Sequence, residues 1–328
     1  MGLLLEVRDL RVAYRTGDGG TFRVLDEVSF MLESGEVMGV LGESGSGKST
    51  LATSLLGLFH ANAVAKSGGV LFEGRNLLQA GPGELQKIRG KRISLIFQEP
   101  SVALHPTMRV GQQVRQVLAA HGMNARKALN QSVRELLQTM FAEEAERIGR
   151  SYPHQLSGGQ RKRVLIAQAI ACRPSLVIAD EPTASLDPTT QMEILGVFRD
   201  LRRNLGIAMI FITHNPALLA GFADRVLVLY AGRVVELGPA EAVLASPKHP
   251  YTRALFQSIP PFPRGPHDGS KRKLPTIPGD SRPSSLPSAG CRFEPRCAER
   301  MDVCKSREPD LVNLGDRHTV SCFRYEAK

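Results

Sequence analysis

Hydrophobic and polar positions along the chain follow two different periods, and together they predict strands and helices. Leu4–Val12 and Phe22–Phe30 alternate in strand fashion, on either side of a glycine-rich turn. Three short apolar runs predict buried strands: Glu36–Leu41, Leu176–Ala179 and Ile207–Thr213. Helical character predicts three helices: Lys48–Phe59, Gln131–Ala145 and residues 164–171. Strands that alternate with helices indicate a mostly parallel α/β sheet.

The composition changes after Ile259 and divides the chain into segments. Residues 260–290 are rich in proline, with interspersed Gly and Ser, and we expect a linker with little regular structure there. Residues 291–328 hold four of the five cysteines. The 328 residues are enough for two domains, or for one large domain with an appendage. We therefore expect a domain over 1–259, a linker over 260–290 and a small cysteine-containing tail domain over 291–328.

Net charge and hydropathy limit whether the chain can bind nucleic acid or enter a membrane. The net charge is +10, but the basic residues are scattered and Trp is absent, so a surface on which nucleic-acid bases could stack is not apparent. We expect no direct nucleic-acid binding. No apolar run approaches the roughly 18 residues that cross a bilayer. The N-terminus has no signal pattern, so we expect a cytosolic protein that reaches a membrane only through a partner.

One glycine-rich segment predicts a nucleotide site. Gly42-Glu43-Ser44-Gly45-Ser46-Gly47-Lys48-Ser49 matches G-x-x-x-x-G-K-[ST] and lies between a predicted strand and a predicted helix. The glycines let successive backbone N–H groups converge on phosphate oxygens. Lys48 would reach the β- and γ-phosphates, and the Ser49 hydroxyl would bind Mg²⁺. We also count Thr50, the next residue of this loop and helix start, among the nucleotide-binding residues.

Two carboxylates follow a buried strand further along the chain. Leu176–Ala179 leads directly into Asp180 and Glu181. Asp180 can hold Mg²⁺ through water, and Glu181 can orient or polarise the attacking water. Alone, this pair would indicate an ordinary acidic turn, but with a phosphate loop upstream it favours nucleotide hydrolysis.

A second candidate anion site opens a later helix and identifies the family. In Leu156-Ser157-Gly158-Gly159-Gln160, Ser157 is a plausible helix cap and the glycines leave backbone N–H groups accessible. The sequence resembles the ATP-binding subunits of ABC transporters over roughly residues 3–258. The resemblance implies an ABC ATPase core with the P-loop NTPase fold and ATP as its nucleotide. It also implies that Ser157, Gly158, Gly159 and Gln160 contact the nucleotide bound by a second ATPase subunit.

The same resemblance assigns further residues by motif. Tyr14 is similar to the aromatic residue that stacks on adenine, and Gln98 to the glutamine that touches Mg²⁺ and senses the membrane partner. Asp187, in Ser185-Leu186-Asp187, resembles the D-loop aspartate, which lies at the partner's nucleotide. His214 resembles the switch histidine near the γ-phosphate. Asn215 departs from the family, which commonly has Asp after that histidine, and this puts only fine positioning in doubt.

The resemblance also implies partners. A second ATPase subunit, expected to be a paralogue, two transmembrane permease subunits and an extracytoplasmic solute-binding protein would complete an importer at the cytoplasmic face of the bacterial inner membrane. Residues 99–160 are the expected helical subdomain that docks onto the permeases. The alternative is a soluble ABC ATPase that acts on nucleic acid or ribosomes. Such proteins commonly carry two ATPase cores or long insertions, and this chain has neither.

The cysteine tail narrows the family further. His249-Pro250-Tyr251-Thr252-Arg253-Ala254-Leu255 and the motif from Gly290 to Cys297 resemble the ATPase subunits of oligopeptide/dipeptide importers, a group that includes nickel and metallophore systems. In that group such a tail carries a [4Fe–4S] cluster, which the resemblance places on Cys291, Cys297, Cys304 and Cys322. The spacing is unlike that of zinc ribbons, but Zn²⁺, free thiols and a disulfide stay open. Cys172 is expected to be a small core residue.

Overall fold

The computed structural model describes residues 2–17, 19–259, 276–279 and 289–326. Its strands form two sheets. The smaller sheet has the order β2-β1-β4-β5 and is antiparallel, with these bounds: β1 Leu3–Arg15, β2 Thr21–Glu33, β4 Ala63–Phe72 and β5 Arg75–Asn76. The predicted strands at Leu4–Val12 and Phe22–Phe30 are its two longest members, so this prediction is confirmed.

The larger sheet has the order β11-β12-β10-β9-β3-β8-β7-β6. The five strands from β9 to β6 run parallel: β3 Val37–Leu41, β6 Ile93–Ile96, β7 Leu176–Asp180, β8 Ala208–Ile212 and β9 Arg225–Tyr230. The other three pair antiparallel: β10 Arg233–Pro239, β11 Leu311–Asn313 and β12 Thr319–Ser321. The three short apolar runs are the buried strands β3, β7 and β8, as predicted. The tail, expected as a separate small domain, contributes β11 and β12 to the same sheet as the rest of the chain.

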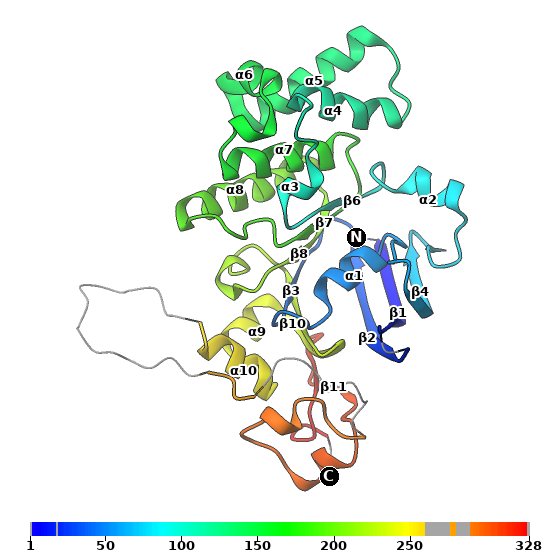
Figure 1. The fold of residues 1–328 in the computed structure, drawn as a ribbon. Coiled ribbons are helices and arrows are strands. Elements are labelled where there is room, and N and C mark those ends of the chain that lie inside the picture. Colours follow the sequence, from blue (N-terminus) through cyan, green and yellow to red (C-terminus); the bar gives the residue numbers. More distant parts are fainter. Residues whose placement is uncertain (1, 18, 260–275, 280–288, 327–328) are drawn as a thin grey trace, which may run out of the picture.

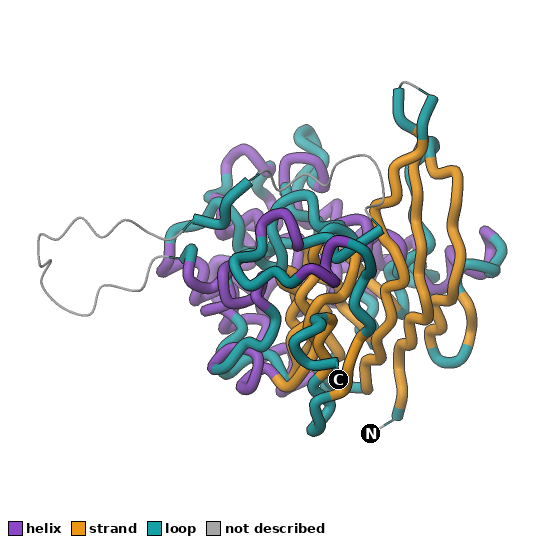
Figure 2. The backbone as a smooth tube through the Cα atoms, turned by 90° about the horizontal axis from the view of Figure 1, so that it is seen from below, coloured by secondary structure: helices purple, strands orange, loops and turns teal. Residues whose placement is uncertain are grey.

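Helices lie beside the larger sheet and above it (Figure 1). Those of the core are α1 Lys48–Ser54, α2 Pro82–Ile88, α7 Gly158–Ile170, α8 Pro188–Leu205, α9 Ala240–Ala245 and α10 Pro250–Gln257. The expected helical subdomain contains α3 Pro100–Ala103, α4 Val110–Ala120, α5 Arg126–Phe141 and α6 Ala145–Arg150. In Figure 1, α4, α5 and α6 lie above α7, and the short α3 lies below it. Viewed from below, the strands of the smaller sheet stand on one side of the molecule and most helices lie on the other (Figure 2).

Three predicted helices need corrected bounds. The helix predicted over Lys48–Phe59 ends at Ser54, because Gly57 adopts a left-handed φ of +65° and Leu58 N–H donates to the Thr53 carbonyl at 2.9 Å, a pattern that ends helices. The one predicted at Gln131–Ala145 is α5, which begins five residues earlier. The one predicted at 164–171 is α7, which already begins at Gly158. The predicted linker lies largely outside the described residues, and its described part, residues 276–279 and 289–290, contains no helix or strand.

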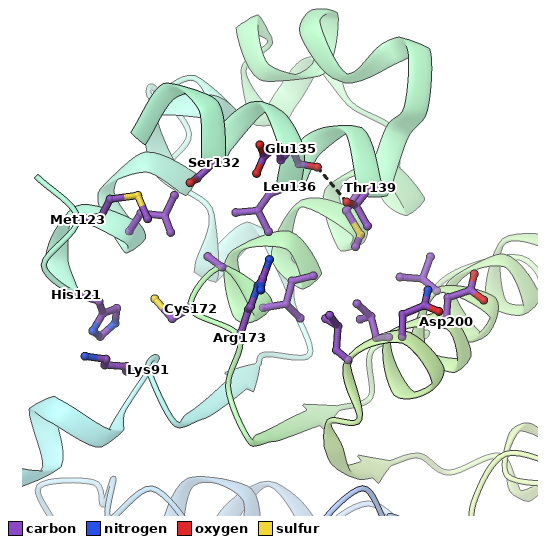
Figure 3. A pocket seen from close by; sticks show the side chains of 18 residues that line it. Lys91, His121, Met123, Ser132, Glu135, Leu136, Thr139, Cys172, Arg173 and Asp200 are labelled. Atoms are coloured by element: carbon purple, nitrogen blue, oxygen red, sulfur yellow. Dashed lines mark hydrogen bonds between the residues drawn. The ribbon is translucent and has the colours of Figure 1, made fainter. Parts of the chain in front are cut away.

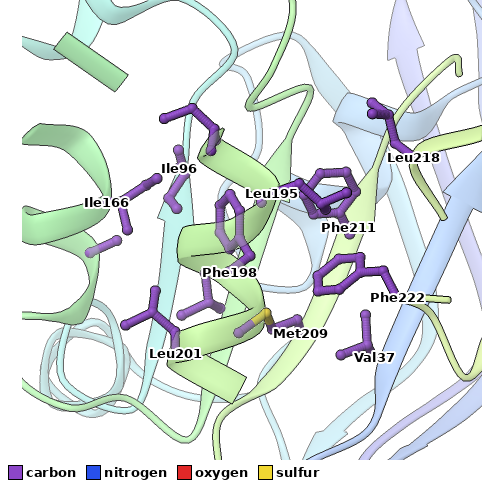
Figure 4. Packing of buried hydrophobic residues seen from close by; sticks show 14 of the residues in the cluster. Val37, Ile96, Ile166, Leu195, Phe198, Leu201, Met209, Phe211, Leu218 and Phe222 are labelled. Atoms are coloured by element: carbon purple, nitrogen blue, oxygen red, sulfur yellow. The ribbon is translucent and has the colours of Figure 1, made fainter. Parts of the chain in front are cut away.

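The main core lies between the larger sheet and helices α7 and α8 (Figure 4). Phe198 of α8 meets Phe211 of β8 edge to face at 5.4 Å, and Phe211 meets Phe222 in the same way at 5.2 Å. A second apolar cluster fills the space between the two sheets and includes Leu51 of α1. The parallel strands are therefore buried on both faces, which explains why β7 and β8 read as unbroken apolar runs.

Candidate functional site

The phosphate loop leaves β3 between its neighbours β8 and β9 and returns as α1. Two glycines are required by its shape. Gly42 has a φ of +157°, and a Cβ there would lie 2.3 Å from the Leu229 carbonyl oxygen. Gly47 caps α1 with a φ of +105°, and a Cβ there would lie 2.9 Å from Leu25. The loop is thus held tightly against β9 and β2, as the predicted motif demands.

Lys48 is folded back across this loop. Its side chain is buried, and Nζ donates to the carbonyl oxygens of Gly42 and Glu43, each at 2.8 Å. Burial lowers the pKa of Lys48, while the carboxylates of Glu181, Asp180 and Glu43 oppose that shift. The ammonium group therefore lies beside the loop, where the charges of these three carboxylates act on it.

Ser49 and Asp180 form a pair that fits a magnesium ion. Asp180 ends β7, and burial raises the pKa of Asp180, while the Ser49 side chain at the start of α1 acts to lower it. The Asp180 Oδ1 atom has no hydrogen-bond partner among the described residues. The buried Ser46 hydroxyl likewise lacks a partner there. A carboxylate oxygen with a free lone pair beside a hydroxyl is the oxygen donor set that Mg²⁺ prefers.

Three predicted residues meet at the carboxyl ends of neighbouring parallel strands. Gln98 follows β6, Glu181 follows β7 and His214 follows β8. Gln98 Nε2 donates to Glu181 Oε2 at 3.0 Å, and His214 Nδ1 lies 3.4 Å from the same oxygen. The hydrogen bond to His214 lowers the pKa of Glu181, and the same bond raises the pKa of His214.

Glu181 is held in an uncommon backbone conformation, with a φ of +45°. Its N–H donates to the Ile212 carbonyl at 3.0 Å, which ties the turn after β7 to β8. The carboxylate is ionised and partly open to water, and a histidine stands beside it. A carboxylate in that state can orient or accept a proton from a water molecule.

Lys162 is a site residue that the sequence interpretation missed, because it was counted among scattered basic residues. It lies on α7 with only 3% of its surface exposed, and Nζ donates to the backbone carbonyl of Gln98. Burial lowers its pKa to about 8, against the opposing effect of Glu181 and Asp180. The sequence did contain a signal for the burial of Lys162, because it lies four residues before Ile166 and therefore on the apolar face of the helix.

The Ser157–Gln160 segment caps α7 as predicted. Ser157 Oγ accepts from the Gln160 N–H at 3.2 Å, and Gln160 Oε1 accepts from the Ser157 N–H at 3.1 Å, which is a capping box. A Cβ at Gly159 would lie 2.6 Å from Thr190 of α8, so glycine is needed for these helices to pack. Gly158 begins the helix. The predicted contact of this segment with a second subunit's nucleotide is not tested by a single chain.

The other residues assigned by motif also have local structural roles. Asp187 caps α8 by accepting from the Thr190 N–H at 3.0 Å. Tyr14 lies at the end of β1, and its ring meets His60 edge to face at 5.9 Å. Asn215 accepts from the Ala217 N–H at 3.0 Å, a bond that an aspartate oxygen would accept equally well. The departure at Asn215 therefore preserves the local turn.

The four tail cysteines gather around one small cavity of about 20 Å³. Cys291, Cys297, Cys304 and Cys322 all line it, and all are free thiols. Burial raises the pKa of Cys291 to about 12 and also raises the pKa of Cys297 and Cys322. Within the described residues, however, no three His, Cys, Asp or Glu side chains are close enough to hold a metal ion. Thiols are suitable metal ligands, but in this structure the four cysteine side chains are not close enough together to enclose a metal ion.

A larger cavity of about 510 Å³ separates the helical subdomain from the core (Figure 3). Leu136 of α5 points into it from one side, and Cys172 and Arg173, which follow α7, stand on the other. His121 and Met123 close the end near Lys91. Its lining is mostly apolar, with a rim of charged side chains. Cys172, expected in the core, is half-buried at this cavity.

In the part of the chain that the structure describes, the search for a helix with the length and hydropathy to cross a bilayer finds none.

Comparison with known proteins identifies the family. The ABC transporter family model matches residues 25–184, and the family model "Oligopeptide/dipeptide transporter, C-terminal region" matches residues 235–304. The oligopeptide transport ATP-binding protein OppD of Escherichia coli is 43% identical, over 98% of this chain and 93% of its own length. OppD of Haemophilus influenzae is 42% identical, over 98% of both chains.

Solved structures show the same cassette. The dimeric, post-hydrolysis structure of the ATP-binding cassette MJ0796 with ADP and Pi is 28% identical, with a TM-score of 0.64, and covers 72% of this chain and 99% of that one. The structure of cbiO1 from Clostridium perfringens, part of the transporter complex cbiONQ, is 30% identical, with a TM-score of 0.63, over 75% and 92%. The chain is an ABC-type ATPase and belongs to the ATP-binding subunits of ABC transporters, in the group that carries the oligopeptide/dipeptide C-terminal region.

Proposed function

We propose that this chain hydrolyses ATP to power the import of di- or oligopeptides, or of a related solute such as nickel or a metallophore. The likeness to oligopeptide transport proteins over 98% of the chain, tail included, carries this proposal. Co-purification with two multi-span membrane subunits tests it. Stimulation by DNA or ribosomes instead would favour the soluble alternative, for which no observation speaks.

Residues of the phosphate loop and at the carboxyl ends of the strands carry out ATP hydrolysis. Lys48 and the loop amides neutralise phosphate charge, together with Gly42, Ser44, Gly45, Ser46, Gly47 and Thr50. Ser49, Asp180 and Gln98 would hold Mg²⁺, which supplies charge stabilisation at the phosphates. Glu181 orients the attacking water and takes up its proton, and His214 shares charge with Glu181 through their contact. Tyr14 would stack on the adenine.

The remaining motif residues serve a second ATPase subunit, expected to be a paralogue. Backbone N–H groups of Gly158 and Gly159, with the Ser157 hydroxyl, would bind the partner's γ-phosphate, alongside Gln160 and Asp187. In the single chain the Ser157 Oγ atom accepts from the Gln160 N–H, which leaves the Ser157 O–H free to donate to a phosphate oxygen while the helix cap stays formed. ATP shared between two chains would then close the dimer.

The cavity between subdomain and core is the proposed docking site of a permease helix. It presents apolar side chains from α5 and residues after α7, and helices commonly lay an apolar face into such a groove. The cavity lies between the helical subdomain, which follows Gln98, and the core that holds the nucleotide site. The chain would thereby sit at the cytoplasmic face of the membrane, and solute selectivity would belong to the permeases and an extracytoplasmic solute-binding protein.

Leu136→Glu tests this docking site. A carboxylate among apolar lining residues would oppose burial of a permease helix, so we expect at least about a tenfold loss of co-purified permease. Basal ATPase activity of the chain should stay within about twofold, because Leu136 is remote from the strand ends. Leu136→Met is the matched control and should bind normally. Full recovery of the permeases with Leu136→Glu would place the docking site elsewhere.

The tail cysteines are the proposed ligands of a [4Fe–4S] cluster, with Zn²⁺ as the alternative. Four thiols from separate turns around one cavity support this, although the ring of sulfurs would have to draw together and lose protons to bind. A bound cluster would stabilise a tail that has little core of its own. We assign it a structural role.

Cys304→Ser tests the cluster. Removing one of four ligands should lower the iron and sulfide content of anaerobically purified protein by more than about half. Cys172→Ser, outside the tail, is the control and should leave both contents unchanged. Stoichiometric zinc without iron in the unaltered protein would rule out the cluster, and absence of both metals would rule out the metal site.

A further inference from the structure

The C-terminal tail reaches the phosphate loop through Arg296. Arg296 lies between two of the tail cysteines, and its guanidinium makes two parallel bonds to the Glu43 carboxylate: Nη1 to Oε2 at 2.7 Å and Nη2 to Oε1 at 3.1 Å. Glu43 is the second residue of the phosphate loop, so 253 positions separate the two partners. Only 6% of the Arg296 side chain is exposed, which distinguishes this pair from an ordinary surface ion pair.

Two further polar contacts hold the Arg296 guanidinium in place. Its Nε donates to the Pro278 carbonyl at 2.8 Å, and its Nη1 lies 3.3 Å from the Tyr230 hydroxyl at the end of β9. Phe293 of the tail packs edge to face on Tyr230 at 5.3 Å and on Tyr251 at 5.4 Å. Tyr251 completes the arrangement, because its hydroxyl accepts from the Glu43 N–H at 2.8 Å. Both the backbone and the side chain of Glu43 are therefore held from outside the loop.

Glu43 needs such a partner because of its charge. Its carboxylate belongs to the loop that is to receive a triphosphate, and it acts on the pKa of Lys48. An unpaired carboxylate there would repel the phosphates and compete for the lysine. A bidentate guanidinium neutralises that charge and fixes the orientation of the carboxylate.

We infer that Arg296 is a positioning residue of the nucleotide site: by holding and neutralising Glu43 it sets the affinity of the phosphate loop for ATP, so that the C-terminal tail is part of the ATP-binding machinery. The tail strands β11 and β12 extend the sheet of the core, and Arg292 reinforces the junction by pairing with buried Asp26. This inference rests on the nucleotide site proposed above.

The test separates a charge effect from a merely structural one. In the full-length protein assembled with its partners, Arg296→Met should raise KM and Kd for ATP about tenfold and leave kcat within about twofold, because the residues at the strand ends are untouched. Adding Glu43→Gln to Arg296→Met removes the uncompensated carboxylate. KM should then fall to within about twofold of that of Glu43→Gln alone.

Three outcomes are decisive. An unchanged KM in Arg296→Met, or a raised KM that Glu43→Gln does not correct, overturns the inference. Failure of the unaltered protein to bind ATP overturns the proposed function instead. Arg296→Lys keeps the charge but loses the two parallel donors of the guanidinium, so we expect about a threefold rise in KM. If Arg296→Met does not fold, Arg296→Gln, which also lacks the charge, is compared with and without Glu43→Gln instead.

Discussion

Glu181→Gln is expected to keep ATP binding and to lower the rate of ATP hydrolysis by about a thousandfold, within the range that a positioned general base contributes. The amide keeps the size of the side chain but can neither take up a proton nor hold charge beside His214. Lys48, Ser49 and Asp180 stay in place, so the Kd for ATP should change by less than about threefold. Single-turnover hydrolysis and equilibrium nucleotide binding measure the two quantities separately.

The control for this variant is Glu84→Gln, an identical change on exposed α2. It should hydrolyse ATP at the normal rate. Normal turnover in Glu181→Gln would show that another group activates the water and would contradict the assignment made from the contacts with Gln98 and His214.

Ser157→Arg is expected to abolish solute uptake and to lower the companion subunit's ATP turnover by at least about a hundredfold, the order of effect seen when one anion-binding donor is lost. The bulky side chain replaces the hydroxyl proposed to face the partner's γ-phosphate and removes the cap of α7. This chain's own phosphate loop, which begins after β3, should still bind ATP. Uptake into proteoliposomes and ATPase activity of mixed dimers are the measurements.

Ser157→Thr separates the two consequences, because threonine keeps both a hydroxyl and the ability to cap. It should retain most of the uptake. If Ser157→Arg left the companion's turnover and the uptake untouched, this segment would be a helix cap and nothing more.

Much of the site could be predicted because its residues follow buried strands. The apolar runs at β7 and β8 fix where Asp180, Glu181 and His214 stand, and parallel neighbours bring these strand ends together. The glycine spacing of the loop predicts its bend in the same local way. Each inference depends on a short stretch of sequence and on a general rule of sheet geometry.

The features that the sequence did not predict depend on contacts between distant segments. In the sequence, Lys162 is the middle one of three consecutive basic residues. Only the packing of α7 shows that it is buried against Gln98. The pairing of Arg296 with Glu43 joins opposite ends of the chain. The tail reads as a separate appendage, but β12 pairs with β10 and so joins the sheet of the core. No local pattern encodes these pairings.

If the proposed function holds, ATP hydrolysis at this site is coupled to the import of a peptide. The most direct measurement is the ATPase activity of the reconstituted complex, with its permeases and companion subunit, in the presence and absence of peptide-loaded binding protein. We predict a severalfold stimulation by the loaded protein, which Glu181→Gln in this chain abolishes together with uptake. ATP hydrolysis that proceeds at one rate with or without the loaded protein, and continues in Glu181→Gln, would show that this site does not drive peptide import.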